Sequence, residues 1–298
     1  MQRTTWSRLV VPGLIALAFG ACHPETREAM RLRDACEAGD AEACTGFGLR
    51  LLAGQHVLRD RARAAELLRG GCDAGVVEGC VRLGGMYDEG TGVAGNDTVA
   101  SGLYDRACRG GALEGCTRLG VLYLAGEGVA VDTARAATLF EQACGGGDAA
   151  GCSRAGSLLV VSGDPGRALD YFQRACDGGV MSGCTELGRL YATGSGVAQD
   201  GARAATLLDQ ACEAGEAAAC FHLGDLHATG NGVAREFERA AELYRTSCNR
   251  GYGEGCYALG VLHQDGAGVP RHPARAAALF SRACELGYAA ACPAESES

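Results

Sequence analysis

Cysteine is the residue type in this chain whose number and spacing point most directly to chemistry. Of the 17 cysteines, sixteen form eight pairs in which seven residues separate the two members. The pairs are Cys36/Cys44, Cys72/Cys80, Cys108/Cys116, Cys144/Cys152, Cys176/Cys184, Cys212/Cys220, Cys248/Cys256 and Cys284/Cys292. Thiols in such numbers either bind metal ions or oxidise to disulfides.

The gap between paired cysteines favours disulfides. Zinc sites generally use cysteines two to four residues apart, with four ligands converging on one ion, and the repeated seven-residue gap does not provide that geometry. We therefore predict one disulfide within each pair, each worth about 2–3 kcal/mol because it closes a short loop, and no metal or other cofactor. The competing scheme joins cysteines 28 residues apart, such as Cys44 and Cys72, and leaves Cys36 and Cys292 without partners.

The seventeenth cysteine, Cys22, follows a segment that looks like a secretory signal. Arg3 and Arg8 precede an apolar stretch over residues 9–21 that is too short to span a bilayer. The last residues before Cys22 are Ala-Phe-Gly-Ala. They resemble the lipobox of bacterial lipoproteins, whose cysteine is acylated and becomes the mature N-terminus, although Phe19 stands where leucine is usual. We expect residues 1–21 to be a lipoprotein-type signal peptide and Cys22 to be lipidated; the alternative is an ordinary signal peptide cut nearby.

Composition excludes several classes of function. The net charge of −9 and the pI of about 5.2 argue against nucleic acid as a partner. All 27 basic residues are arginine, which excludes a P-loop lysine, a Schiff-base lysine and the Ser-x-x-Lys pair of serine β-lactamases. The chain also lacks Gly-x-Ser-x-Gly and His-Glu-x-x-His. Because no other stretch is apolar enough to cross a membrane, we expect membrane contact through a lipid anchor only.

The cysteine pairs mark a tandem repeat. The first cysteine of each pair recurs every 36 residues, except for one step of 32, and a period in this range indicates a solenoid. We predict an all-α fold in which helix A runs from the second cysteine of a pair to a Gly-x-Gly turn, and helix B runs from there to the next cysteine. Residues 22–26 are then an anchor and linker, residues 27–292 the solenoid, and residues 293–298 a tail. The predicted helical pairs span residues 44–72, 80–108, 116–144, 152–176, 184–212, 220–248 and 256–284.

Glycine and aspartate occupy fixed places in each repeat. A glycine lies four residues after the second cysteine (Gly48, Gly84, Gly120, Gly156, Gly188, Gly224 and Gly260). Because glycine costs about 1 kcal/mol inside a helix, we predict that a neighbouring helix passes there too closely for a Cβ atom. Asp132 and Asp200 are predicted N-caps of helix B. In the short fourth repeat the turn ends in Asp164-Pro165, an N-cap followed by proline at the first helical position.

The repeat resembles a known family. Its consensus is Leu-Gly-x-Leu-Tyr-x-x-Gly-x-Gly-Val-x-x-Asp followed by Arg-Ala-Ala-x-Leu-Phe-x-x-Ala-Cys-x-x-Gly, as in residues 119–147. This pattern resembles the Sel1-like repeat, a relative of the tetratricopeptide repeat, and the cysteine pairs resemble its disulfide-rich branch, the Helicobacter cysteine-rich proteins. The resemblance implies a right-handed α/α superhelix that serves as an adaptor or scaffold. The resemblance also implies an alternative activity, because some cysteine-rich members have been described as penicillin-binding proteins or β-lactamases.

Helix A faces line the concave groove in such superhelices, so the variable helix A positions are the candidate binding residues. Two residues after the second cysteine, Arg82, Arg118 and Arg154 could form a cationic ladder for carboxylates or phosphates; the alternative is ordinary solvated arginine. In the later repeats an aromatic patch with imidazoles could bind a peptide, and a metal site is the competing interpretation there. The remaining groove candidates are Arg189, Phe221, His222, Asp225 and Tyr257, whereas His227 and His263 occupy positions where tyrosine is usual.

These observations lead to one functional prediction. We expect an exported, lipid-anchored, monomeric scaffold that binds a protein or peptide in its groove, without a catalytic site. The residue after Cys22 is His23 rather than aspartate, which favours the outer membrane over retention in the inner one. The alternatives are a weak hydrolase of β-lactams or cell-wall amides, which follows only from the resemblance, and a structural spacer of the envelope.

Overall fold

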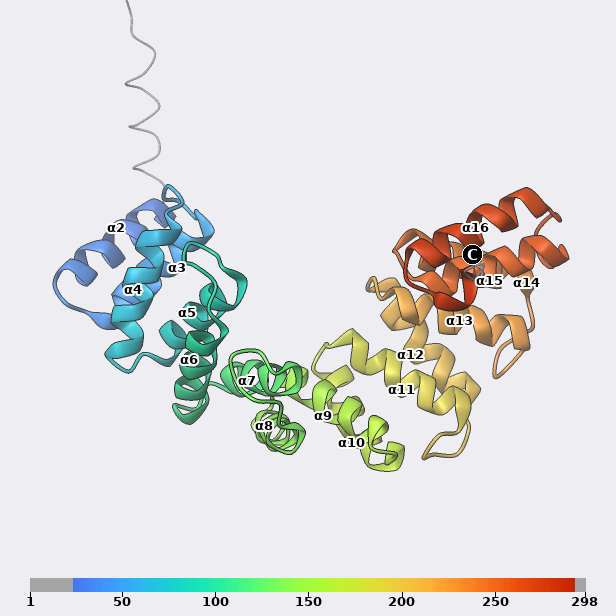
Figure 1. The fold of residues 1–298 in the computed structure, drawn as a ribbon, viewed down its shortest axis with the longest axis horizontal. Helices are drawn as coiled ribbons and strands as arrows, with labels where there is room; N and C mark the ends of the chain where they lie inside the picture. The colour runs from blue at the N-terminus through green and yellow to red at the C-terminus, as the bar shows by residue number, and fades with distance from the viewer. Residues whose placement is uncertain (1–23, 293–298) are drawn as a thin grey trace, which may run out of the picture. The chain divides into compact units, whose positions relative to one another are not determined.

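The computed structural model describes residues 24–292, and every regular element in that range is helical (Figure 1). The prediction of an all-α solenoid is therefore confirmed. The elements are α2 (Pro24–Glu37), α3 (Ala41–Ala53), α4 (Arg61–Asp73), α5 (Val77–Glu89), α6 (Asp97–Arg109), α7 (Leu113–Ala125), α8 (Thr133–Gly145), α9 (Ala149–Val161), α10 (Pro165–Asp177), α11 (Met181–Thr193), α12 (Gly201–Glu213), α13 (Ala217–Thr229), α14 (Phe237–Asn249), α15 (Gly253–Asp265), α16 (Pro273–Glu285) and a short 3₁₀ helix, η1 (Ala289–Ala291). The predicted signal peptide, the lipidation site at Cys22 and the tail at 293–298 lie outside the described residues.

Odd-numbered helices from α3 to α15 are the A helices and the even-numbered ones are the B helices. The prediction that each A helix begins at the second cysteine of a pair is wrong, because every one of them begins three residues earlier. The cysteines that therefore lie inside the first turn of an A helix, rather than at its boundary, are Cys44, Cys80, Cys116, Cys152, Cys184, Cys220 and Cys256.

The early start of the A helices has a local cause. The glycine three residues after the first cysteine, such as Gly75 or Gly179, has a positive φ that ends helix B and reverses the chain at once. Only one further residue separates this glycine from the next helix. In α3 that residue is Asp40, whose carboxylate accepts hydrogen bonds from the backbone N–H groups of Glu42 and Ala43. The reversal is thus completed before the second cysteine is reached.

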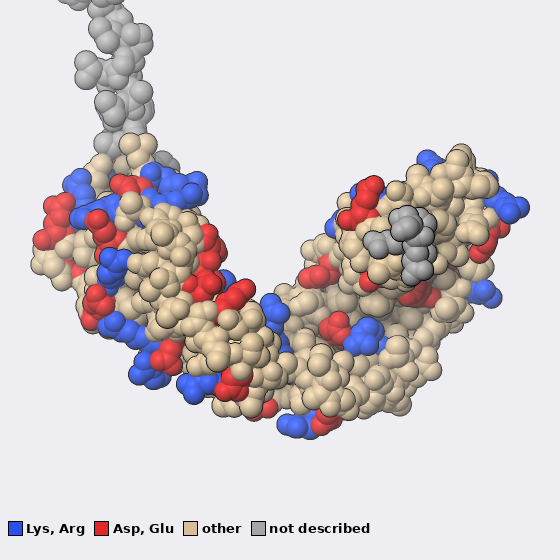
Figure 2. All heavy atoms as spheres, viewed as in Figure 1, with Lys and Arg blue, Asp and Glu red and all other residues tan. Residues whose placement is uncertain are grey.

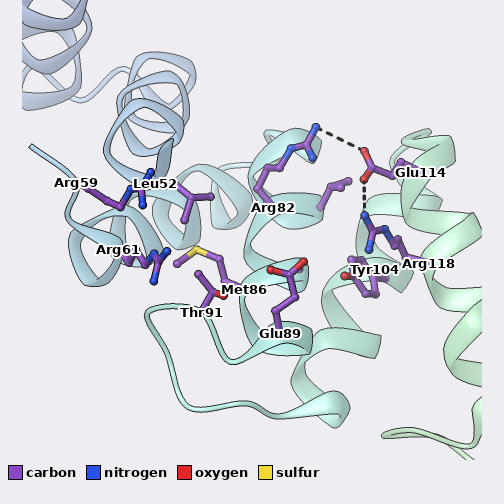
Figure 3. A pocket seen from close by; sticks show the side chains of 12 residues that line it. Leu52, Arg59, Arg61, Arg82, Met86, Glu89, Thr91, Tyr104, Glu114 and Arg118 are labelled. Atoms are coloured by element: carbon purple, nitrogen blue, oxygen red, sulfur yellow. Dashed lines mark hydrogen bonds and ion pairs between the residues drawn. The ribbon is translucent and has the colours of Figure 1, made fainter. Parts of the chain in front are cut away.

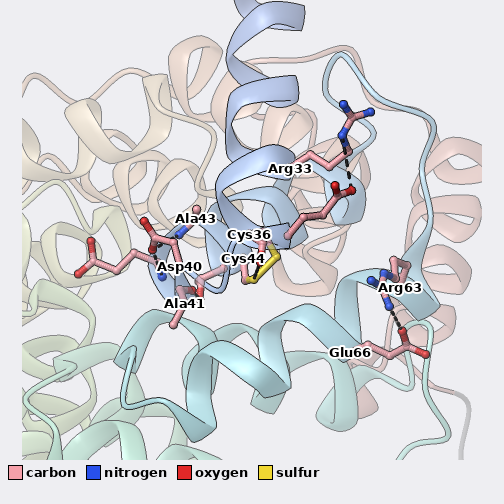
Figure 4. The surroundings of a disulfide bond; sticks show 11 residues. Arg33, Cys36, Asp40, Ala41, Ala43, Cys44, Arg63 and Glu66 are labelled. Atoms are coloured by element: carbon pink, nitrogen blue, oxygen red, sulfur yellow. Dashed lines mark hydrogen bonds and ion pairs between the residues drawn. A yellow bond between two sulfur atoms is a disulfide. The ribbon is translucent and has the colours of Figure 1, made fainter.

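Disulfides link each B helix to the A helix that follows it, and the last one links α16 to Cys292, directly after η1. Each bridge joins two cysteines separated by seven residues, with Cα atoms 4.5–4.8 Å apart. Figure 4 shows the first of them, between α2 and α3. The eight bridges are Cys36–Cys44, Cys72–Cys80, Cys108–Cys116, Cys144–Cys152, Cys176–Cys184, Cys212–Cys220, Cys248–Cys256 and Cys284–Cys292. Because the joined elements belong to successive repeats, the bridges tie the repeats together along the chain.

The second cysteines are part of the core as well as of the bridges. From Cys80 to Cys256 they are buried, with at most 2% of the residue exposed. Cys80 packs with Val81 and Ala107, and Cys152 packs with Ala175. These bridges therefore serve packing and cross-linking, and they present no thiol to a ligand.

The chain divides into two compact units, and each is described by itself. Unit 1 ends at Ala136 and unit 2 begins at Ala137. In unit 1 the buried side chains of Leu68, Leu83 and Met86 pack between successive helices. In unit 2 a corresponding cluster contains Phe172, Leu187 and Leu190. Both cores are thin layers between helical pairs, as expected for a repeat that buries its apolar face against its neighbours.

The recurrent helix A glycine is a point of close packing, as predicted. A Cβ atom at Gly84 would lie 2.7 Å from the ring of Tyr104, and one at Gly224 would lie 2.7 Å from the ring of Tyr244. A Cβ atom at Gly156 would lie 2.8 Å from the ring of Phe172. The neighbour is the large side chain of the B helix in the same repeat, four residues before its cysteine, so these glycines let the two helices of a pair approach each other.

The turns follow the predicted chemistry, with one exception. Asp200 accepts a hydrogen bond from the Arg203 N–H, and Asp164 caps α10 ahead of Pro165. Both glycines of a Gly-x-Gly turn have positive φ, a conformation that few other residues tolerate. In the first repeat His56 occupies the place of the second glycine with φ of 58°, and its ring contacts the carboxylate of Glu25 at the start of α2.

Candidate binding surface on the A helices

A surface with a defined register runs along the A helices within each unit. We call it the helix-A face and define it by the residues two before and one, two and five after the second cysteine of each pair. In unit 1 the Arg82 guanidinium lies 3.6 Å from the Glu114 carboxylate of the next A helix. In unit 2 the hydroxyls of Ser153 and Ser182, also on successive A helices, are 3.3 Å apart. Side chains of adjacent repeats are therefore direct neighbours on this face.

Unit 1 brings two of the predicted groove arginines together. Glu114 lies between them, with its carboxylate 3.6 Å from the Arg82 guanidinium and 3.5 Å from that of Arg118 (Figure 3). Arg82 also donates to Glu78 at 2.7 Å, and this hydrogen bond is the main reason why its pKa is raised. The side chains of Arg82 and Arg118 remain 41% and 45% exposed, so both can still bind a ligand.

These two arginines belong to a pocket of about 330 Å³. Arg59 and Arg61 lie on its opposite side, with Leu52 and Met86 between the two pairs of arginines (Figure 3). Sequence reasoning missed Arg59 and Arg61, because they precede and begin a B helix rather than lie on an A helix. The lining residues are Leu52, Arg59, Arg61, Val81, Arg82, Gly85, Met86, Glu89, Thr91, Tyr104, Glu114 and Arg118.

Positive charge is concentrated in this pocket and does not extend over the rest of the surface of unit 1. In the view of Figure 2, positive and negative side chains are interspersed over the surface of unit 1, and the chain as a whole is acidic. The pocket lining nevertheless holds four arginines and two glutamates, and with Glu78, which pairs with Arg82 at 2.7 Å, one positive charge remains in excess. An anionic group is therefore attracted to the pocket itself rather than to the surrounding surface.

Arg154, the third member of the predicted ladder, belongs to unit 2. It lines a separate depression of about 340 Å³ together with Ser153, Ser182 and Glu186. Glu186 also accepts two hydrogen bonds from Arg189, at 2.8 and 3.0 Å, which neutralises that groove candidate. This depression resembles the pocket of unit 1 in volume but contains one arginine, and its apolar lining residues are Ala150 and Val180.

Aromatic rings cluster in the last two repeats of unit 2. The ring of Phe221 lies 5.6 Å from that of Tyr252 and 5.8 Å from that of Tyr244. The ring of Tyr257 lies 5.2 Å from those of Phe280 and Tyr288. Phe221 and Tyr257 are half-buried, so much of their surface packs against their own repeat and only part is open to a ligand.

Beside Phe221, burial controls the ionisation of three groups. Burial lowers the pKa of His222 and raises that of Asp225, whose carboxylate accepts a hydrogen bond of 2.6 Å from the Tyr244 hydroxyl. Burial and the nearby carboxylate of Glu254 raise the pKa of Tyr252 to about 12. Sequence reasoning did not select Tyr252, which precedes an A helix; its aromatic side chain beside the cysteine pair was the available signal.

The two histidines at tyrosine positions contact the backbone of the turns that follow. The His227 Nδ1 atom is 3.3 Å from the Ala234 carbonyl oxygen, and the His263 Nδ1 atom is 3.2 Å from that of Pro270. Across residues 24–292 no group of three or more His, Cys, Asp or Glu side chains has a metal-binding arrangement. In the same range no helix is both long and apolar enough to cross a bilayer.

Tandem helical pairs cross-linked at each junction, with a variable helix-A face, define a disulfide-rich repeat scaffold. The Sel1 repeat family matches residues 41–76, 77–111, 113–148, 152–180, 182–216, 217–252 and 253–288, and the chain belongs to this family. Sel1 repeat proteins generally mediate protein–protein interactions, and the fold of this chain is that of such a scaffold. Its many disulfides are typical of proteins exported to an oxidising compartment.

Several solved structures are similar to this chain. The c5321 protective antigen of uropathogenic Escherichia coli, which displays an SLR fold, is 28% identical with a TM-score of 0.74; the match covers 87% of this chain but only 57% of the antigen. A Sel1 repeat protein from Oxalobacter formigenes is 24% identical with a TM-score of 0.72, over 81% of this chain and 99% of its own. The Helicobacter pylori cysteine-rich protein B is 30% identical with a TM-score of 0.36, over 42% of this chain and 90% of its own. No curated protein sequence matches this chain.

Proposed function

We propose that this chain is an exported, lipid-anchored, monomeric scaffold that binds a protein or peptide on its helix-A face. The observation that carries the proposal is the register of that face. Packing dictates the glycines, leucines and cysteines of each repeat, whereas the exposed and half-buried positions of the helix-A face vary from arginine to serine to aromatic residues. Successive repeats therefore present different side chains at regular intervals on one scaffold.

The spacing of repeats suits an extended ligand. Packed helices lie about 8–10 Å apart, and an extended chain advances about 3.3 Å per residue. A peptide that runs across the A helices of one unit would therefore meet a new repeat about every three residues. The direct neighbours Arg82/Glu114 and Ser153/Ser182 support this spacing, because side chains of adjacent repeats lie close enough to contact the same ligand residue.

The proposed location combines the disulfides with the N-terminal sequence. Eight bridges require an oxidising compartment to form and persist. Cleavage before Cys22 and acylation of its thiol would hold the protein at a membrane. The predicted linker at residues 22–26 is shorter than expected, because α2 already begins at Pro24. His23 after the anchor favours the outer membrane. Labelling with a radioactive fatty acid tests this arrangement: the label should enter the wild-type chain and be absent from Cys22→Ser.

Site-specific photo-crosslinking tests the binding face. A photoreactive amino acid at Ser182, which is exposed on the helix-A face, should trap a discrete partner when the oxidised protein is mixed with envelope extract. The control is the same amino acid at Gly102, an exposed position on a B helix with no atom within 4 Å of a Cβ. Equal trapping at both positions, or none at either, would contradict the proposal.

A nitrocefin assay on the same sample separates the hydrolase from the scaffold. A scaffold leaves the chromogenic β-lactam intact, whereas turnover well above that of a reduced, unfolded control would show a catalytic site. A structural spacer would give neither a trapped partner nor turnover.

A further inference from the structure

We propose that the pocket of unit 1 binds a peptide segment in which an aspartate or glutamate side chain lies beside an apolar one. This inference rests on the proposed scaffold function and names its ligand class. It follows from the charge of the pocket, from the apolar side chains between its arginines, and from the carboxylate of the chain itself that already lies between two of those arginines.

The charge of the pocket comes from two different parts of the repeat. Arg82 and Arg118 project from the A helices α5 and α7, whereas Arg59 lies near the end of the α3–α4 connection and Arg61 begins α4 (Figure 3). Guanidinium groups pair with carboxylates through charge-assisted hydrogen bonds. Four of them around a space of about 330 Å³ provide several alternative partners for one carboxylate.

The connection that holds Arg59 and Arg61 is fixed by hydrogen bonds. The Asp60 carboxylate accepts from the Arg63 N–H at 2.9 Å and caps α4. The Arg59 guanidinium donates to the Ala53 carbonyl at the end of α3, also at 2.9 Å. Because both ends of this short stretch are tied to helices, the arginines are held at the pocket before a ligand arrives, which lowers the entropic cost of binding.

Apolar side chains favour a peptide over a free inorganic anion. Leu52 and Met86 lie between the two pairs of arginines (Figure 3), and Val81 also lines the pocket. Leu58, directly before Arg59, is 92% exposed and borders an adjoining depression with Arg59 and Arg61. These apolar groups gain nothing from phosphate but can bury an aliphatic or aromatic side chain.

Glu114 indicates how a ligand carboxylate would be held. Its carboxylate lies 3.5 Å from Arg118 and 3.6 Å from Arg82, both longer than a good charge-assisted hydrogen bond. A ligand carboxylate would therefore bind these two arginines either beside the Glu114 carboxylate or in its place. If so, removal of the Glu114 charge should strengthen binding, a gain that a purely structural ion pair would not produce.

Three matched peptides test the ligand class. Fluorescein-labelled Ser-Glu-Leu-Glu-Leu-Ser and its variants with glutamine or lysine in place of both glutamates are titrated against the full chain with its disulfides intact, with fluorescence anisotropy as the readout. We expect the glutamate peptide to bind about tenfold more tightly than the glutamine peptide, and the lysine peptide to bind weakest. Inorganic phosphate at matched ionic strength should not displace the glutamate peptide.

Variants locate the site. Arg82→Glu and Arg118→Glu should each weaken binding of the glutamate peptide about tenfold, and the milder Arg82→Gln and Arg118→Gln serve if the reversed charges prevent folding. Arg154→Glu is the matched control, because it has the same register position in unit 2 but lies outside this pocket; it should change binding by less than about twofold. Glu114→Gln should strengthen binding about two- to fivefold, the scale of an exposed ion pair.

The outcomes distinguish the ligand class from the scaffold function. Equal binding of the three peptides, displacement by phosphate, an equal effect of Arg154→Glu, or no gain with Glu114→Gln would each overturn the acidic-peptide site. If the peptides fail while Ser182 still traps a partner, the scaffold function stands and only the inferred ligand class is wrong. If both experiments fail, both proposals are wrong.

Discussion

Gly84 on α5 offers a quantitative test of how closely the two helices of a repeat pack. In Gly84→Ala the new methyl group would lie 2.7 Å from Cε1 and 2.8 Å from Cδ1 of Tyr104. That ring is fully buried, and its hydroxyl donates to Asp88 at 3.2 Å, so it cannot swing away. Overpacking costs about 1–3 kcal/mol, while alanine gains about 1 kcal/mol over glycine in a helix. We expect a net loss of up to about 2 kcal/mol.

Gly102 on α6 is the matched control in the same unit. It is exposed inside a helix, and no atom lies within 4 Å of the position of a Cβ. Gly102→Ala therefore keeps the gain in helix propensity without the clash, and should stabilise the unit by about 0.5–1 kcal/mol. The same substitution is thus predicted to have opposite signs at two positions in one unit.

Urea unfolding followed by far-ultraviolet circular dichroism, with the disulfides intact, measures both effects. Because the chain has two compact units, the transition is analysed for more than one phase, and a repeat protein need not unfold in a single step. If Gly84→Ala raised the unfolding midpoint as Gly102→Ala does, the close approach of α5 and Tyr104 would be refuted. The packing explanation for all the recurrent helix A glycines would be refuted with it.

Three further predictions concern the bridges, ionisation and capping. Replacing Cys108 and Cys116 together by serine should destabilise unit 1 by about 2–3 kcal/mol on the loop-entropy estimate; an unchanged urea midpoint would contradict that account. Because burial lowers the pKa of His222 from its usual 6.5, the unfolded chain takes up a proton more readily than the folded one, so stability present above about pH 6.5 should be lost as the pH falls below it. In His222→Gln the melting temperature should depend less on pH over that range. If it depends on pH as steeply as in the wild-type chain, the effect belongs to another group. Asp200→Ala should cost about 1 kcal/mol, because its carboxylate caps α12 by accepting from the Arg203 N–H at 3.0 Å; Asp200→Asn should retain most of the stability.

Much of the fold could be predicted because the same spacing of cysteines and helix A glycines recurs in seven repeats. Regular spacing of cysteines and glycines indicated the helical pairs and the close approach at positions such as Gly84. The caps at Asp164 and Asp200 were readable because capping depends on a few adjacent residues. The start of the A helices was predicted three residues too late, because the reversal at glycines such as Gly75 and caps such as Asp40 lie outside the cysteine-to-turn segment that the period emphasises.

Less of the candidate site could be predicted. Register alone indicated Arg82 and Arg118, since equivalent positions in adjacent repeats face the same side. It could not indicate Arg59 and Arg61, which reach the same pocket from a connection in the preceding repeat. It also could not show that Glu186 neutralises Arg189.

The order of the helices, the junctions between repeats and the face that carries variation all follow from periodicity, because each is set by contacts between residues close in sequence. The character of the site depends on contacts between repeats. Glu114 on α7 divides its charge between Arg118 of its own helix and Arg82 of the preceding repeat. Such contacts decide which charges remain available to a ligand, because the effective charge of a side chain depends on the partners and the solvent around it.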